Sequence, residues 1–147
     1  MVAGSRPSRA SERQNVTLSD TGATLGGGGV VNFSGAAFGS ARIRGGAGAQ
    51  TFNVSLFSAP VDLDGGGGGD AVAIGAPVGT TSGAIYSVIN NDGPSIVNID
   101  VAGTITSHTV VNVASVSLTG TPFNDTLNGA ASVLPITFHA LGGNDHL

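Results

Sequence analysis

The sequence repeats itself at a shift of twenty residues, and this repeat limits the folds open to the chain more than any other feature. IRGGAGAQTFNV (residues 43–54) aligns with LDGGGGGDAVAI (63–74), and VSLTGTPFNDTL (116–127) aligns with ITFHALGGNDHL (136–147). The matched apolar positions are Ile43 with Leu63, Phe52 with Val72, Val54 with Ile74, Val116 with Ile136, and Leu118 with Phe138. A fixed period of this length is typical of repeat proteins, in which each unit stacks on the next.

All four segments follow one pattern: alternating apolar residues, a Gly-rich stretch, an acidic or amide residue, and then apolar residues two apart. Alternation at period two predicts strands with one buried face, and glycines favour turns. Twenty residues are too few for a βαβ unit, which needs roughly thirty. Between Ile74 and Val116 the period blurs, although strand-like runs continue. We therefore predict an all-β, right-handed parallel β-solenoid of about seven coils of roughly 18–20 residues each.

The charge distribution separates the two ends of the chain. All five basic residues are arginines within the first 44 of the 147 residues, whereas the chain from Gly45 onward holds seven aspartates and no Lys, Arg or Glu. A nucleic-acid-binding protein needs a basic surface, so this class is excluded. Short acidic side chains suit a hard cation instead. The absence of cysteine excludes disulfides and thiolate metal sites.

The length allows one domain at most. Residues 1–14 are polar and are predicted to be a disordered lead-in, and residues 15–147 a single β-solenoid domain. No apolar run is long enough to span a membrane, and residues 1–14 lack the apolar core of a secretory signal. The chain stops in the middle of its pattern, at LGGNDHL, so we expect a fragment of a longer array.

The Gly-rich octamers resemble the hemolysin-type calcium-binding repeat (the RTX nonapeptide), whose pattern is G-G-x-G-x-D-x-U-x with U a large apolar residue. GGGGGDAV (65–72) keeps every position, whereas GGAGAQTF (45–52) has Gln50 in place of the aspartate. GTPFNDTL (120–127) and ALGGNDHL (140–147) keep the aspartate and the leucine but lose some glycines. The rest of the chain resembles the β-helical repeat regions of large bacterial surface and secreted proteins.

This resemblance implies a parallel β-roll that binds Ca²⁺ at its turns. Calcium takes six to eight oxygens, which Gly-rich turns supply as carbonyls and aspartates as carboxylates. Because the turns recur every twenty residues, we expect the sites along one edge only. The predicted ligands are those of a main site between the last two turns and of a weaker one beside Gln50: Asp125, Asp145, Asn124, Asn144, Gly142 and Gly143, and then Asp70 and Gly68. The competing interpretation of each turn is a tight corner without an ion.

The function that follows is a structural or adhesive segment of a bacterial extracellular or cell-surface protein. Its expected partners are Ca²⁺, a cell-surface glycan and neighbouring solenoid repeats. The alternatives are an ion-independent β-helical domain that binds carbohydrate or a protein partner and, with less support, a β-helical polysaccharide-active enzyme. The chain has one glutamate, no lysine and no nucleophile elbow, HExxH motif or P-loop, so we predict that it is not an enzyme. We expect its three histidines, at positions 108, 139 and 146, at the surface.

Overall fold

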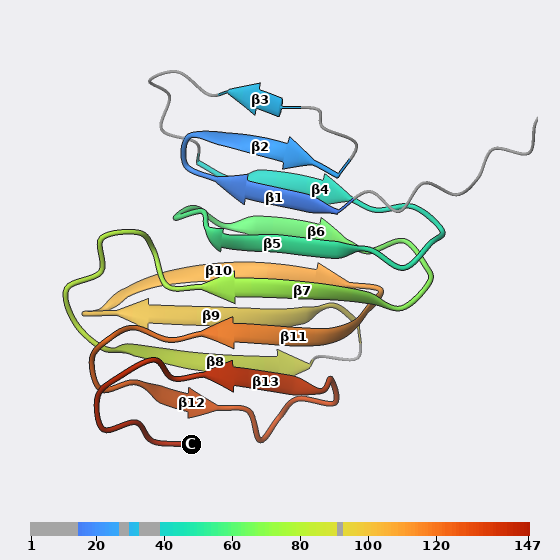
Figure 1. The fold of residues 1–147 in the computed structure, drawn as a ribbon. Coiled ribbons are helices and arrows are strands. Elements are labelled where there is room, and N and C mark those ends of the chain that lie inside the picture. The colour runs from blue at the N-terminus through green and yellow to red at the C-terminus, as the bar shows by residue number, and fades with distance from the viewer. Residues whose placement is uncertain (1–14, 27–29, 33–38, 91–92) are drawn as a thin grey trace, which may run out of the picture.

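A computed structural model describes residues 15–26, 30–32, 39–90 and 93–147, and these residues form only strands, turns and loops. The strands make two sheets that lie one in front of the other in Figure 1. The seven-stranded sheet, called sheet A below, has the order β13-β11-β7-β5-β1-β2-β3, and the six-stranded sheet B has the order β12-β8-β9-β10-β6-β4. The lead-in predicted for residues 1–14 lies outside the described residues. The strands are β1 (Val16–Ser19), β2 (Gly22–Leu25), β3 (Val30–Asn32), β4 (Ala41–Arg44), β5 (Thr51–Leu56), β6 (Val61–Asp64), β7 (Asp70–Gly75), β8 (Ala84–Asn90), β9 (Ser95–Val101), β10 (Thr104–Val111), β11 (Val113–Thr119), β12 (Thr126–Asn128) and β13 (Ile136–His139).

The prediction of an all-β protein is confirmed, but the prediction of a right-handed parallel β-solenoid of about seven coils is wrong. Both sheets mix parallel and antiparallel pairs, and the molecule is a β-sandwich. Strands β1, β2 and β3 pair antiparallel at one end of sheet A, and β8, β9 and β10 pair antiparallel within sheet B. These six strands interrupt the winding that a solenoid requires.

The shift of twenty residues appears as parallel pairing in the chain before the β8–β10 meander and again after it. Ile43 of β4 pairs with Leu63 of β6 in sheet B, and Phe52 of β5 pairs with Val72 of β7 in sheet A. β11 and β13 pair in the same way. In these regions each repeat unit supplies one strand to each sheet, so the aligned apolar residues of neighbouring units lie side by side on the inner faces.

The middle of the chain departs from the repeat because its strands fold back as hairpins. β9 and β10 are joined by Ala102 and Gly103, which both have positive φ (52° and 85°), as a two-residue hairpin turn of the favoured twist requires. Asp100 Oδ1 accepts a hydrogen bond from Gly103 N at 2.8 Å and closes this turn. A hairpin keeps consecutive strands in one sheet, whereas a repeat unit sends its second strand to the other sheet.

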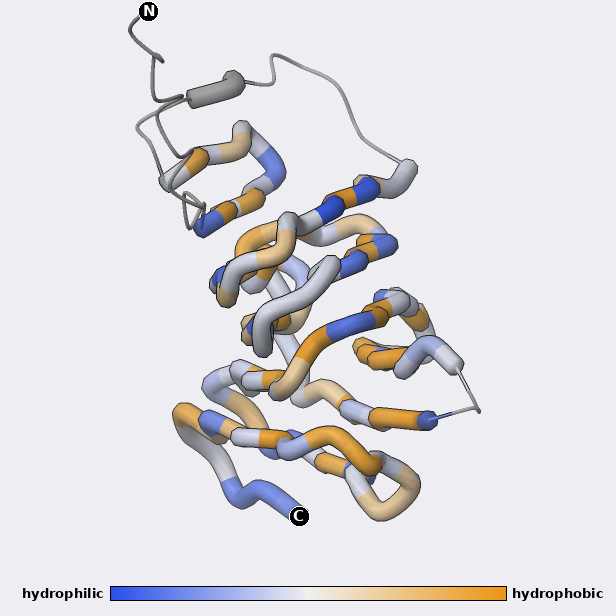
Figure 2. Tube along the Cα trace, turned by 90° about the vertical axis from the view of Figure 1, so that its right-hand side faces the viewer, coloured by the Kyte–Doolittle hydropathy of each residue, from blue (hydrophilic) through white to orange (hydrophobic). Residues whose placement is uncertain are grey.

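The core lies between the two sheets. Hydrophobic and hydrophilic residues alternate along the strands in Figure 2, as expected for strands with one face buried. The Tyr86 ring packs edge-on against Phe138, with 5.4 Å between ring centroids, and joins the two sheets near the C-terminal end. His108 is also buried, facing the core from β10, so the prediction that all three histidines lie at the surface is wrong. The buried hydrophobic residues are Leu18, Phe52, Val54, Phe57, Val61, Leu63, Val72, Ile74, Ala84, Tyr86, Val88, Val97, Ile99, Val110, Val116 and Leu118.

Candidate functional site: the aspartate turns

The four Gly-rich turns lie at two opposite edges of the sandwich. Residues 45–50 and 65–70, the upstream turns, lead from sheet B into the first residues of β5 and β7. Residues 120–125 and 140–145, the downstream turns, follow the last residues of β11 and β13. All four of these strands are parallel, so the two pairs of turns lie at opposite ends of sheet A (Figure 1). The expectation of a single edge is therefore wrong, because one pair of repeats begins in sheet B and the other in sheet A.

Asp125, in the first downstream turn, is buried, and both of its carboxylate oxygens accept hydrogen bonds from the chain. Oδ1 accepts from Ala84 N at 2.7 Å and from Thr121 Oγ1 at 2.8 Å. Oδ2 accepts from Thr121 N at 2.7 Å. Three donors from two segments thus converge on one carboxylate, which ties the turn to the start of β8.

Asp145, Asn124 and Asn144 connect the two downstream turns to each other. Asp145 Oδ1 accepts a hydrogen bond from Asp125 N at 2.9 Å, and Asn124 Oδ1 accepts one from Asn144 N at 2.8 Å. Each bond spans twenty residues, so the side chains of the Asn-Asp steps bond to the backbone of the neighbouring repeat. The predicted residues of the main site are therefore brought together, but as acceptors of N–H groups.

Gly142 and Gly143 let the second downstream turn lie against the first. Gly143 has φ of 105°, and a β-carbon there would stand 2.5 Å from the Phe123 carbonyl oxygen. Gly142 is less constrained, since the nearest atom to its β-carbon would be 3.6 Å away. Close backbone stacking explains Gly143 without an ion, because only glycine fits such a contact.

Asp70, in the second upstream turn, is fully buried but only one of its oxygens has a hydrogen bond. Oδ1 accepts from Gln50 N at 2.7 Å. Oδ2 is buried and has no partner among the described residues. A β-carbon on Gly65 would lie 2.7 Å from Asp70 Oδ2 and 2.3 Å from the Asn112 carbonyl oxygen, so these two oxygens converge on one side of the Gly65 backbone.

The unpaired oxygen of Asp70 has an identifiable structural cause. In the first upstream turn Gln50 Oε1 accepts a hydrogen bond from Gly46 N at 2.9 Å, and Asp125 Oδ2 accepts the corresponding bond from Thr121 N. The corresponding donor for Asp70 is Gly66 N, which donates instead to Asp64 Oδ1 at 3.0 Å. Asp64 thus takes the hydrogen bond that would otherwise satisfy Asp70.

Asp64 lies on the outer side of the same turn and is held by three groups. A hydrogen bond from Asn112 Nδ2 at 2.8 Å, the one from Gly66 N, and the Arg44 guanidinium at 3.5 Å together keep the pKa of Asp64 below its ordinary value. Gly68, with φ of 106°, lets this turn stack on Ala47–Ala49 of the upstream turn before it. The loop between Asp64 and Asp70 therefore has a carboxylate at each end: Asp64 is partly exposed and paired, and Asp70 is buried with only one oxygen hydrogen-bonded.

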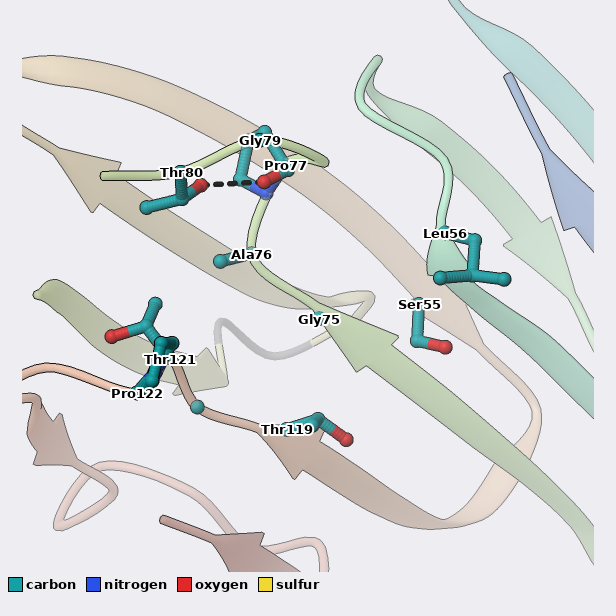
Figure 3. Close-up of a pocket in the computed structure, with 11 residues that line it drawn as sticks. Ser55, Leu56, Gly75, Ala76, Pro77, Gly79, Thr80, Thr119, Thr121 and Pro122 are labelled. Carbon is teal, nitrogen blue, oxygen red and sulfur yellow. Dashed lines mark hydrogen bonds between the residues drawn. The ribbon is translucent and has the colours of Figure 1, made fainter. Parts of the chain in front are cut away.

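A shallow pocket lies at the other edge, where β5, β7 and β11 end (Figure 3). Its hydroxyl groups are mostly engaged within the chain: Ser55 Oγ donates to Asn53 Oδ1, and Thr80 Oγ1 donates to the Pro77 carbonyl. No aromatic ring lines it, so it offers a sugar no face for stacking. The lining residues are Ser55, Leu56, Gly75, Ala76, Pro77, Gly79, Thr80, Thr119, Gly120, Thr121 and Pro122.

Three residues that complete the two sites were missed in the sequence: Asn112, Thr121 and Ala84. Asn112 has a positive φ of 54°, which asparagine adopts more readily than most residues, and its carbonyl faces the Asp70 turn from the junction of β10 and β11. The only sign of Asn112 in the sequence was an asparagine between two valines, Val111 and Val113, which indicates a break between strands. Nothing in the sequence relates Ala84 N to Asp125, because that contact depends on the path of the chain.

Comparison with known proteins identifies no relative: no protein-family model, curated protein or solved structure matches this chain. Within the described ranges, no three His, Cys, Asp or Glu side chains cluster as a ready-made metal site. No helix among the described residues has the length and apolar character needed to cross a bilayer.

Proposed function

We propose that this protein is a stiff structural segment of a bacterial extracellular or cell-surface protein, and that its Gly65–Asp70 turn binds one Ca²⁺ ion. The observation that carries the calcium proposal is the buried Oδ2 of Asp70, which lacks a hydrogen-bond donor and faces the Asn112 carbonyl oxygen. The resemblance of GGGGGDAV to the calcium-binding repeat points to the same turn.

An oxygen of a buried carboxylate without a partner is unfavourable, since the lost hydration is not replaced. A cation replaces it and also removes the repulsion between the carboxylate and the nearby carbonyl dipole. Oxygens are concentrated at this edge: Gln50 Oε1 and the Gly65 carbonyl oxygen both lie within 2.4 Å of the position of a β-carbon on Gly45. The ion would take Asp70 Oδ2 and the Asn112 carbonyl as protein ligands, and water would complete its coordination.

The downstream turns support the structural half of the proposal. Asp125 has no oxygen without a donor, so a cation there would have to displace N–H groups from a buried site. Its carboxylate is suited to fixing the backbone. Hydrogen bonds that recur at a spacing of twenty residues hold neighbouring units in a single register, which is what a stiff spacer requires.

The pocket and the buried aspartates offer little support for carbohydrate binding or catalysis. The pocket of Figure 3 has no aromatic lining and few free hydroxyls. The buried aspartates accept hydrogen bonds from backbone N–H groups, and the Thr121 hydroxyl beside Asp125 donates to that carboxylate.

Thermal unfolding of the full chain in EGTA and in Ca²⁺ tests the calcium proposal. If Ca²⁺ is present at about 100 times its Kd, binding to the folded state alone should stabilise the protein by about 2.7 kcal/mol. Asp70→Asn should remove the difference between the two conditions, whereas Asp100→Asn, in the hairpin turn, should keep it. An equal melting temperature of the wild type in EGTA and Ca²⁺, or a calcium response that survives Asp70→Asn, contradicts the proposal.

A further inference from the structure

The open edge formed by β12 and β13 differs from the opposite edge of sheet B. β12 pairs with β8 and has a single bridge to His146, and β13 pairs with β11; the described residues place no strand on their outer sides (Figure 1). Strand β4, at the other edge of sheet B, has Arg42 and Arg44 on its outer face. Charged residues protect an edge strand from pairing with another chain. β12 (TLN) and β13 (ITFH) have no Lys, Arg, Asp, Glu or Pro.

The backbone groups that face this edge can be identified. The Pro135 and His139 carbonyls accept hydrogen bonds from Val116 N and Gly120 N of the inner neighbour. Backbone groups alternate in direction along a strand, so the N–H groups of Ile136 and Phe138 point to the open side. Large apolar side chains are also exposed around this end: Val133 at 79%, Leu141 at 71% and Leu147 at 77%.

The last Asn-Asp step leaves one half of a repeated contact unused. Between the two downstream turns, Asp125 N donates to the following Asp145 carboxylate, and Asn124 Oδ1 accepts from the following Asn144 N. The next contact in this series would use Asp145 N as donor and Asn144 Oδ1 as acceptor. Neither group has a hydrogen-bond partner in the described part of the chain.

We infer that this edge docks a strand–turn–strand segment that runs parallel to residues 136–147 and has an Asn-Asp step in its turn. Its first strand would extend sheet A by pairing with β13, and its second would extend sheet B beside β12 and His146. Its aspartate would accept a hydrogen bond from Asp145 N, and its asparagine N–H would donate to Asn144 Oδ1. Alternating apolar residues in the segment would cover Ile136 and Phe138, which are only half-buried. The occupant is therefore a segment of a different protein chain that has the sequence pattern of residues 136–147. A folded second copy does not fit, because its own Asp145 Oδ1 and Asn144 N are already bonded to its preceding turn.

The test uses the full-length ¹⁵N-labelled chain in EGTA and the twelve-residue peptide ITFHALGGNDHL, so that calcium binding and edge docking are judged separately. At saturating peptide, amide hydrogen exchange of Ile136 and Phe138 should slow at least tenfold, and the Asp145 amide resonance should move downfield. A control peptide with alanine in place of its aspartate should bind at least fivefold more weakly and leave the Asp145 amide unshifted. The amides of β4 should be unaffected by either peptide.

Two results would overturn this inference. One is the absence of protection at millimolar peptide, or equal protection by both peptides, because the edge would then not select the Asn-Asp turn. The other is a concentration-dependent dimer of the chain alone, by sedimentation, with Ile136 and Phe138 already protected. In that case a second copy, paired through its own β13, is the occupant.

Discussion

The turns that contain Asp70 and Asp125 share a sequence pattern, but their carboxylates have different surroundings. Asp125 accepts hydrogen bonds from three donors, whereas Asp70 accepts one and keeps a buried oxygen without a partner. The difference has two sources: Asp64 takes the hydrogen bond of Gly66 N, and Gly66 lacks the hydroxyl with which Thr121 donates to Asp125. A repeat pattern therefore fixes where a carboxylate lies, and its neighbours decide whether that carboxylate holds the backbone or remains free for a ligand.

The largest expected effect comes from removing the two carboxylates one at a time in EGTA. Asp125→Ala leaves the buried N–H groups of Ala84 and Thr121 without an acceptor and should lower the free energy of unfolding by at least about 3 kcal/mol. Asp70→Ala leaves only Gln50 N unpaired and should cost about 1–2 kcal/mol. Urea unfolding followed by circular dichroism measures both, and equal losses would remove the distinction between the two turns.

A pH titration separates the aspartate turns from the core. Burial lowers the pKa of His108 to about 4, so the unfolded chain takes up a proton at higher pH than the folded chain does. Stability should then fall as the pH drops from about 6.5 to about 4, by about 3 kcal/mol in all. Urea unfolding at a series of pH values measures this loss.

His108→Leu should remove most of this pH dependence, because it keeps an apolar side chain in the core without a titrating group. His139→Gln, at an exposed position, is the matched control and should retain the dependence. If the free energy of unfolding of His108→Leu still falls between pH 6.5 and pH 4, other groups cause the pH dependence, the turn carboxylates among them.

Two glycines in the Asp70 turn test whether backbone stacking holds its geometry. A β-carbon on Gly65 would stand 2.3 Å from the Asn112 carbonyl oxygen, so Gly65→Ala should destabilise the fold by about 1–3 kcal/mol. A β-carbon on Gly67 meets nothing within 4 Å and its φ is not positive, so Gly67→Ala should change stability by less than about 1 kcal/mol. Similar melting temperatures for the two variants would contradict the stacking described for this turn.

The smallest effect is expected at the charged edge strand. Arg42 bonds to Asp62 at 2.7 Å, but the two side chains are 78% and 46% exposed. Arg42→Ala should therefore cost no more than about 0.5 kcal/mol at low salt and almost nothing at 1 M NaCl. A larger loss that persists in salt would mean that the aliphatic part of Arg42 packs on sheet B.

The sequence predicted the paired strands but not the way in which they are assembled. Matches such as Ile43 with Leu63 and Val116 with Ile136 are pairs in the structure, because a period-two pattern repeated every twenty residues favours the register that keeps the apolar residues of both strands on the same, buried face. The hairpin at Ala102–Gly103 was missed, because alanine rarely adopts a positive φ and Asp-Val-Ala-Gly is not a typical turn sequence. The solenoid was predicted to continue through the middle of the chain, where β8, β9 and β10 form an antiparallel meander, and the fold class was wrong for that reason.

The candidate sites were predictable in position but not in their bonding. Asp125 and Asp145 lie in the loops that follow β11 and β13, and Asp70 is the first residue of β7, directly after its Gly-rich turn, as the pattern of a Gly-rich stretch followed by an acidic residue predicted. The choice of Gly66 N between Asp64 and Asp70 depends on the path of the backbone through three consecutive positions, and no residue pattern encodes it. The same limit applies to Asn112, whose carbonyl reaches the turn from a strand junction 42 residues beyond Asp70.

Isothermal titration of Ca²⁺ into the calcium-free chain tests the central claim most directly. The proposal predicts one site per chain in the wild type and in Asp100→Asn, and no binding heat in Asp70→Asn. A wild-type chain that takes up no calcium, or an Asp70→Asn chain that binds it with unchanged stoichiometry, would show that the free oxygen of Asp70 is not a ligand.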